Sequence, residues 1–275
     1  MGIEDRVKSG AEGLPQSPIL VPRSVVITGA SSGIGLAFAR HYLERGATVA
    51  AFARRGELLQ ALAAEFPEKV FCYTFDVRDA PAIRQAAADF MARVGVPDII
   101  IANAGVSRGT LTECAEDEEV FQNVMDINVL GMVKTFQPFL ASMRAAKQGT
   151  LVGIASVAGF RGLPGSGAYS ASKAAAISYM ESLRVEMYGS GVKVVTLCPG
   201  YIKTPMTDIN SYPMPFIIKA DDAARRMVLV IERGTSFAVV PWQMGVVGWL
   251  LKRLPNWLYD LAFSKAPHKA RGKVG

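Results

Sequence analysis

The sequence has little of what several common kinds of active site require. It contains only two histidines, His41 and His268, which disfavours a zinc site and Ser-His-Asp chemistry because both rely on imidazole. Its three cysteines, Cys72, Cys114 and Cys198, lie far apart and form no metal-binding or redox spacing. No N-terminal apolar stretch resembles a signal peptide. We therefore expect a protein of the reducing cytoplasm with no bound metal.

Charge is also scarce over most of the chain. Only 20% of residues are charged and 50% are hydrophobic, which is enough for a large core and too apolar for disorder. The formal net charge is +6, and residues 252–275, with six lysines and arginines against one aspartate, carry +5 of it. A nucleic-acid-binding domain would carry its basic surface on the fold itself, so this placement disfavours a nucleic-acid partner.

Segments with strand-like and helix-like patterns alternate along the chain. Residues 1–22 have no periodicity and are interpreted as a mobile leader. We expect strands at 24–28, 47–52, 70–75, 98–102, 150–156, 192–198 and 236–240, and helices at 33–46, 57–66, 80–94, 116–146, 168–188 and 221–232. Apolar strands separated by helices predict an α/β fold, a doubly wound parallel sheet of the Rossmann type with about seven strands. With no linker or internal repeat, residues 23–241 are expected to form a single domain, followed by an aromatic and basic extension, 242–275.

The first expected strand runs into a glycine-rich turn, Thr28–Gly35, with the spacing G-x-x-x-G-x-G. Glycines allow a tight turn and let a diphosphate approach the N–H groups at a helix N-terminus. The turn opens the first strand–helix unit, which favours a dinucleotide site over a generic turn. We expect cofactor contacts from Gly29, Ser31, Ser32, Gly33, Ile34 and Gly35.

The second expected strand ends at Phe52-Ala53-Arg54-Arg55, without the acidic residue that usually binds the ribose hydroxyls of NAD. Guanidinium groups are strong partners for a phosphate monoester, so Arg54 and Arg55 predict NADP(H) in preference to NAD(H). The alternative is that both arginines form a solvated start to the next helix.

Other expected strand ends meet at the same edge of the sheet. Asp76 suits either the adenine amino group or a helix cap before Ala80, and Thr204 suits a carboxamide. The further cofactor-binding candidates are Asp76, Val77, Asn103, Ala104, Gly105, Tyr169, Lys173, Pro199, Gly200, Ile202 and Thr204.

Tyr169 and Lys173 lie four residues apart in an expected helix and so share one face. A nearby cation favours phenolate and lowers the pKa of a tyrosine, which could then exchange a proton near neutral pH. Ser156 ends the fifth expected strand, and the same edge rule places it beside this pair. Asn128 is a polar residue among apolar neighbours in a long helix and requires a partner. The alternative for Tyr169 and Lys173 is an ordinary surface pair.

Together these motifs resemble the short-chain dehydrogenase/reductase family, of the compact single-domain type, over about residues 24–240. Two departures are small: Ala102 stands where many members have asparagine, and Ala155 replaces a frequent serine. Neither affects the residues expected to react.

The resemblance implies roles for four catalytic residues. Tyr169 would be the acid/base, and Lys173 would lower its pKa and hold the nicotinamide ribose. Ser156 would hydrogen-bond the substrate oxygen, and Asn128 would position a water that links Lys173 to solvent. The implied reaction is NADP(H)-dependent interconversion of a carbonyl and a secondary alcohol, in a homodimer or homotetramer. An NAD-dependent alcohol dehydrogenase and a non-catalytic, NADP-binding regulatory protein remain the alternatives.

The segment from Met206 to Lys219 follows no regular pattern and is interpreted as a lid over the substrate. Phe160 and Leu163 are expected to add to the same wall. This lining suits an apolar ketone, aldehyde or secondary alcohol. The alternative is that these side chains only pack the lid.

The extension 242–275 contains all three tryptophans, Trp242, Trp249 and Trp257. The apolar run 237–251 is shorter than the ~20 residues that span a bilayer. Aromatic residues beside a basic tail fit a peripheral segment lying at the inner membrane surface. The alternatives are a subunit contact or a cap over the active site.

Overall fold

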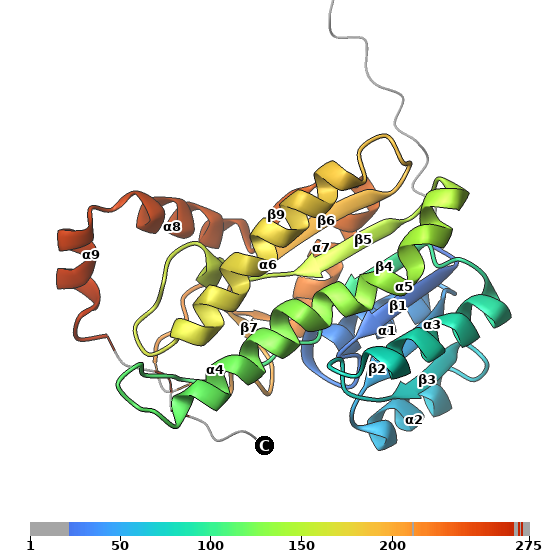
Figure 1. Ribbon diagram of the computed structural model, residues 1–275, viewed down its shortest axis with the longest axis horizontal. Helices are drawn as coiled ribbons and strands as arrows, with labels where there is room; N and C mark the ends of the chain where they lie inside the picture. The colour runs from blue at the N-terminus through green and yellow to red at the C-terminus, as the bar shows by residue number, and fades with distance from the viewer. Residues whose placement is uncertain (1–21, 211, 267–268, 270, 272–275) are drawn as a thin grey trace, which may run out of the picture.

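The computed structural model describes residues 22–210, 212–266, 269 and 271 (Figure 1). Apart from Pro22, the expected leader lies outside the described residues. Every expected strand and helix is present, with each boundary within two residues of its predicted position. The agreement follows from the strong periodicity of the segments, which depends on burial of one or both faces.

Seven parallel strands form one sheet in the order β3-β2-β1-β4-β5-β6-β9. They are β1 (Ser24–Thr28), β2 (Thr48–Ala53), β3 (Val70–Thr74), β4 (Ile99–Ala102), β5 (Thr150–Ile154), β6 (Lys193–Pro199) and β9 (Phe237–Val240). The strand order reverses between β1 and β4, which confirms the doubly wound α/β fold and places a ligand crevice at that point.

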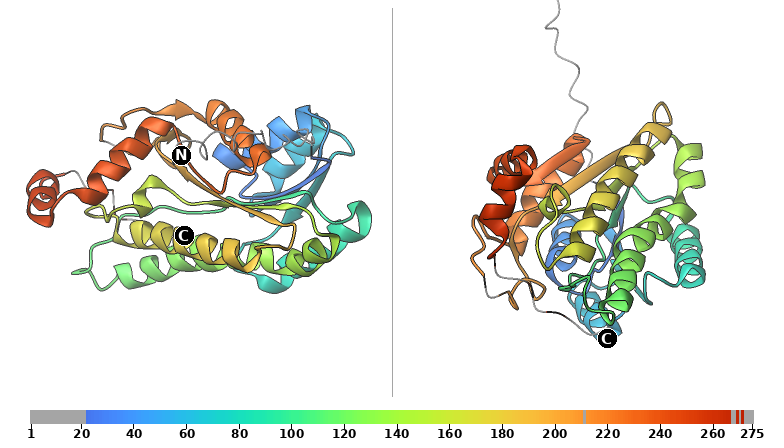
Figure 2. Two further views of the ribbon diagram at one scale, coloured as in Figure 1. Left: turned by 90° about the horizontal axis from the view of Figure 1, so that it is seen from above. Right: turned by 60° about the vertical axis from the view of Figure 1, so that its left-hand side comes forward.

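Helices cover both faces of the sheet (Figure 2). They are α1 (Gly33–Glu44), α2 (Gly56–Glu65), α3 (Ala80–Val94), α4 (Asp117–Met125), α5 (Gly131–Ala146), α6 (Gly167–Glu186) and α7 (Ala220–Arg233). Because side chains alternate along a strand, Val25 and Ile27 of β1 pack with α1 and α7, whereas Val26 packs with α3, α5 and α6. The expected helix 116–146 is α4 and α5 joined through one π-helical turn, Asp126–Leu130.

A second, two-stranded sheet joins β7 (Ile202–Lys203) to β8 (Ile218–Lys219), which the sequence pattern did not predict. The pairing of β7 with β8 brings the two ends of the expected lid segment together. Residues 204–210 and 212–217 between them form no helix or strand. The irregular character of this segment is therefore confirmed, apart from its last two residues.

After β9 the chain continues into α8 (Trp242–Arg253) and α9 (Asn256–Phe263), which project beyond the end of the sheet (Figures 1 and 2). The apolar run 237–251 is thus divided between a strand and a helix. Among the described residues, no helix is both long and apolar enough to cross a membrane.

Candidate active site

The carboxyl ends of the central strands open into one cleft of about 280 Å³. Every cofactor-binding residue expected from the sequence lines it except Gly35. The sequence reasoning missed a further set of lining residues, most of them adjacent to a strand end: Ala53, Phe75, Val106, Ile127, Ile154, Ala155 and Thr207. Extending the strand-end rule by one or two residues would have found all but Ile127 and Thr207.

The glycine-rich turn forms the floor of the cleft at the start of α1. Gly29 and Gly33 have φ of 69° and 56°, in the left-handed region that favours glycine. A Cβ on Gly29 would lie 2.8 Å from Nδ2 of Asn103, so this close approach also requires glycine. A Cβ on Gly35 would overlap the Gly29 carbonyl, behind the cleft wall. Gly35 therefore lets α1 pack on the turn instead of lining the cleft.

Arg55 turns back over the glycine-rich turn. Its Nη2 donates to the hydroxyls of Ser31, at 3.1 Å, and Ser32, at 2.7 Å. Arg54 is also exposed, and its Nη1 lies 3.7 Å from Oδ2 of Asp76. Both arginines line the cleft, and both are exposed to solvent.

Asp76, which follows β3, is not a helix cap. The N-cap of α3 is Asp79, whose side chain accepts from the N–H of Ala82 at 3.0 Å. The Asp76 carboxylate instead accepts from the backbone N–H, Nε and Nη2 of Arg78, at 2.9, 3.0 and 3.0 Å. Burial acts to raise the pKa of Asp76, but these bonds and the charge of Arg54 outweigh it and lower the pKa.

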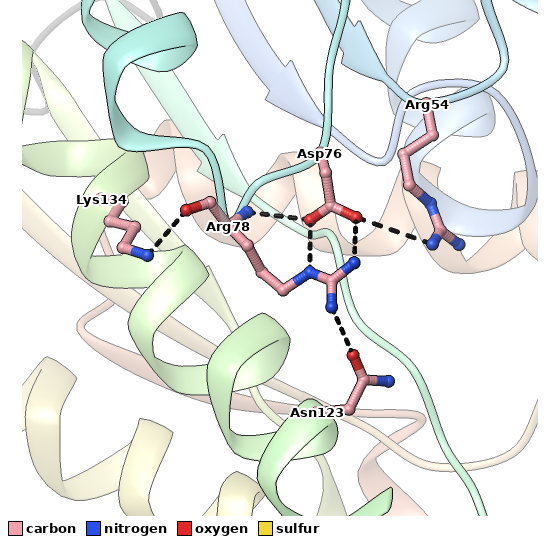
Figure 3. A network of polar contacts seen from close by, with 5 residues as sticks. All are labelled: Arg54, Asp76, Arg78, Asn123 and Lys134. Carbon is pink, nitrogen blue, oxygen red and sulfur yellow. Dashed lines mark hydrogen bonds and ion pairs between the residues drawn. The ribbon is translucent and has the colours of Figure 1, made fainter. Parts of the chain in front are cut away.

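A polar network holds the segment after β3 in place (Figure 3). Nη1 of Arg78 donates to Oδ1 of Asn123 on α4 at 2.9 Å, and Nζ of Lys134 on α5 donates to the Arg78 carbonyl at 2.8 Å (Figure 3). The segment after β3 is thereby fixed to the helices that follow β4, and the Asp76 carboxylate keeps one position in the cleft.

Asn128 lies in the π-helical turn and is almost fully buried. Its Oδ1 accepts from the N–H of Val106 at 2.8 Å, and its Nδ2 donates to the Val106 carbonyl and to Oγ of Ser172, both at 2.9 Å. The expected partner is thus found. Asn128 lies behind the cleft wall and joins the segment after β4 to α6.

Tyr169 and Lys173 occupy the first two turns of α6, and Ser156 begins the short 3-10 turn after β5. Nζ of Lys173 lies 5.8 Å from the centre of the Tyr169 ring and donates to the Ile154 carbonyl at 2.8 Å. Oγ of Ser156 donates to the Pro199 carbonyl at 3.4 Å and accepts from the N–H of Ala158 at 3.1 Å. The three side chains converge on one point of the cleft, as the sequence predicted.

The electrostatics of this group differ from the expectation. Burial raises the pKa of Tyr169 and outweighs the opposing effect of the Ser156 hydroxyl. Burial also lowers the pKa of Lys173 to about 8. The predicted lowering of the tyrosine pKa by Lys173 is therefore wrong for the protein alone. The cost of removing a phenolate from water dominates the pKa of Tyr169, and Lys173 is not among the groups that shift it.

Pro205, Met206 and Thr207, at the start of the expected lid, also line the cleft. Phe160, which was expected here, stacks on Phe237 with ring centres 6.2 Å apart and leaves no room for a Cβ on Gly248. It packs α8 against the sheet, and it is absent from the lining, as is Leu163. Within the described part of the chain, no three histidine, cysteine or acidic side chains gather as a metal site.

Comparison with known proteins gives concordant results. The family model described as short chain dehydrogenase matches residues 23–212. An uncharacterized oxidoreductase of Myxococcus xanthus is 41% identical over 243 residues, which cover 87% of this chain and 96% of the relative.

Two solved structures are similar in fold. A short-chain dehydrogenase from Streptomyces avermitilis superposes with a TM-score of 0.74 at 26% identity, covering 88% of this chain and 99% of that one. A serine dehydrogenase complexed with NADP+ superposes with a TM-score of 0.71 at 27% identity, covering 75% of this chain and 88% of that one.

Proposed function

Because the chain belongs to the short-chain dehydrogenase/reductase family, a family of oxidoreductases, we propose that it is an NADP(H)-dependent enzyme that interconverts a carbonyl and a secondary alcohol on an apolar substrate. The observation that carries this proposal is the convergence of Ser156, Tyr169 and Lys173 beside a glycine-rich turn in one cleft. Residues 23–241 would carry the reaction.

The residues of the cleft fit a nicotinamide dinucleotide. The diphosphate would lie against Gly29, where a larger side chain would fill the space. The N–H groups at the N-terminus of α1, which have no partner within the helix, would donate to it. Asp76 would accept from the adenine amino group, Lys173 would hold the nicotinamide ribose, and Thr204 would hold the carboxamide. When bound, the nicotinamide supplies or accepts the hydride.

Arg55 and Arg54 support NADP(H) over NAD(H). Arg55 is held at the cleft floor by Ser31 and Ser32, neutral partners that leave its charge available to a phosphate. Arg54 shares its charge with Asp76, so its contribution would be smaller. An NAD-dependent alcohol dehydrogenase is the alternative if neither arginine contacts the cofactor.

Tyr169 would protonate the developing alkoxide in reduction and take the proton back in oxidation. Its raised pKa keeps the phenol protonated at neutral pH, which suits the donor role. Ser156 would donate to the substrate oxygen. Asn128 would order the segment at Val106, and the water-positioning role expected for it stays a prediction. Met206 and Pro205 give this end of the cleft an apolar lining.

We also propose a homodimer or homotetramer in the cytoplasm. Exposed apolar side chains on neighbouring helical segments, Phe121, Leu130 and Val185, support a subunit contact, since closed symmetry would bury them. Three free cysteines suit a reducing compartment.

The test is NADPH oxidation with a panel of apolar ketones and aldehydes, for wild type and Tyr169→Phe. We expect the variant to lose turnover, by roughly a hundredfold or more, because it lacks the proton donor, while it still binds NADPH in a fluorescence titration. Tyr188→Phe, at a residue that is 91% exposed, is the control and should behave as wild type.

Undiminished turnover in Tyr169→Phe would rule out the proposed mechanism. NADPH binding by wild type without turnover of any carbonyl or alcohol would favour a regulatory protein, the remaining alternative.

A further inference from the structure

Helix α8 exposes a continuous apolar stripe. Trp242, Val246, Trp249 and Leu250 follow helical spacing on one face, and the two tryptophans are 69% and 53% exposed. The opposite face packs on the body of the protein through Met244 and the close contact at Gly248. The helix is therefore apolar on both sides, and in the described residues nothing covers the outer stripe.

Helix α9 extends this surface. Trp257 and Leu261, one turn apart, are 70% and 73% exposed, whereas Tyr259 between them is buried. These six residues, Trp242, Val246, Trp249, Leu250, Trp257 and Leu261, form what we call the arm surface. It contains every tryptophan of the chain. Tryptophan is the side chain most suited to a membrane–water interface, because its large apolar ring carries one polar N–H.

The arm surface is flanked by positive charge. Lys252, Arg253 and Lys265 are all exposed, and the guanidinium of Arg253 lies 4.0 Å from the centre of the Trp249 ring. Between residues 242 and 266 the single acidic residue is Asp260. An apolar surface with this charge is complementary to an anionic surface.

The arm is held rigidly with this surface outward. Nη1 of Arg161 donates to the carbonyls of Leu251 and Leu254, both at 2.6 Å, at the junction of α8 and α9. The same guanidinium lies 3.9 Å from the centre of the Tyr259 ring, and the Tyr259 hydroxyl donates to the Gly162 carbonyl at 2.6 Å. The arm projects past the rest of the molecule, so it could meet a flat surface without collision (Figures 1 and 2).

We propose that α8 and α9 dock the protein peripherally on an anionic lipid surface. A second copy of the chain is a poorer occupant. A two-fold contact through this face would bring the exposed positive charges of both copies, Lys252, Arg253 and Lys265, into one interface. An anionic bilayer accepts both the apolar side chains and the charge. This proposal does not depend on the reaction that the cleft catalyses.

The test is flotation of the purified full-length protein with vesicles of phosphatidylcholine alone and of phosphatidylcholine mixed with phosphatidylglycerol. We expect binding to the mixed vesicles only, weakening as salt is added. Lys252→Gln/Arg253→Gln should bind roughly 25-fold more weakly, since each basic side chain near such a surface contributes about a factor of five. Trp249→Ala/Trp257→Ala should also lose binding.

The matched control is Tyr188→Ala/Leu229→Ala, which removes two exposed apolar side chains elsewhere on the molecule and should bind as wild type. Absence of binding to mixed vesicles at low salt, or equal binding by wild type and both arm variants, would overturn the proposal. So would a wild-type oligomer that Trp249→Ala/Trp257→Ala converts to a smaller species in light scattering, since that would assign the arm surface to a second copy.

Discussion

At the scale of single residues, burial shifts the pKa values of Tyr169 and Lys173. Lys173 is almost fully buried and Tyr169 is partly buried; burial raises the pKa of the phenol and lowers that of the ammonium to about 8. Each shift favours the neutral form of its group. Lys173 keeps a hydrogen bond to the Ile154 carbonyl, which fixes its position in either state.

Arg55 should determine cofactor preference. We expect Arg55→Ala to weaken NADPH binding by roughly tenfold to a hundredfold, the loss typical of a hydrogen bond to a charged group, and to leave NADH binding unchanged. Calorimetric titration with both cofactors measures this. Arg93→Ala, which removes an exposed arginine paired with Asp89 on α3, is the control. An equal loss for NADH and NADPH would contradict a contact with the 2′-phosphate.

At the scale of elements, the π-helical turn between α4 and α5 fixes the segment after β4. A π-helical turn adds a residue to the helix and commonly occurs at a functional site. Here it contains Asn128, which satisfies both backbone groups of Val106, a residue of the cleft wall. The Asn128 side chain thus supplies the hydrogen-bond partners of the Val106 backbone, which belongs to no strand or helix.

Removal of this side chain should therefore affect stability and turnover together. We expect Asn128→Ala to lower the free energy of unfolding by about 1–3 kcal/mol, because it leaves buried polar groups unpaired, and to lower kcat. Urea denaturation and NADPH oxidation measure the two effects. Asn123→Ala loses only an exposed bond to Arg78 and should change the free energy of unfolding little. A fully stable Asn128→Ala would show that the Val106 groups find other partners.

At the scale of the whole molecule, the end of the described chain returns to the segment after β4. Arg271 bonds the Asp117 carboxylate through Nε at 3.0 Å and Glu116 at 2.6 Å, and Nζ of Lys269 donates to Oγ of Ser107 at 2.8 Å. Asp117 also accepts from the N–H of Leu111. Segments more than 150 residues apart in the sequence are thus joined beside the cleft.

This attachment should depend on pH. The hydrogen bond from Arg271 lowers the pKa of Asp117 below its ordinary value. A lowered carboxyl pKa stabilises the attached state above the ordinary pKa, and that stability is lost as pH falls through the lowered value. We expect the hydrogen-exchange protection factors of residues 107–111, which correct for the pH dependence of intrinsic exchange, to fall at acidic pH in wild type and to be low already at neutral pH in Arg271→Ala. Arg253→Ala is the control, and exchange equal in all three proteins at neutral pH would contradict the attachment.

The sequence by itself determined the fold and most of the cleft. The strands and helices follow from apolar periodicity, because burial in a parallel sheet imposes it locally. The glycine-rich turn and the spacing of Tyr169 and Lys173 are also local patterns. The rule that the carboxyl ends of parallel strands meet at one edge of the sheet then predicted that Ser156 and Arg55 line the same cleft.

Only the tertiary structure decided the features that depend on distant segments. It assigned the helix cap to Asp79 instead of Asp76, gave Asn128 its partners, and placed Phe160 against α8 instead of in the cleft. It also reversed the expected pKa shift of Tyr169. Each of these outcomes depends on burial and on contacts between residues far apart in the chain. Such contacts produce no periodic pattern in the local sequence from which they could be predicted.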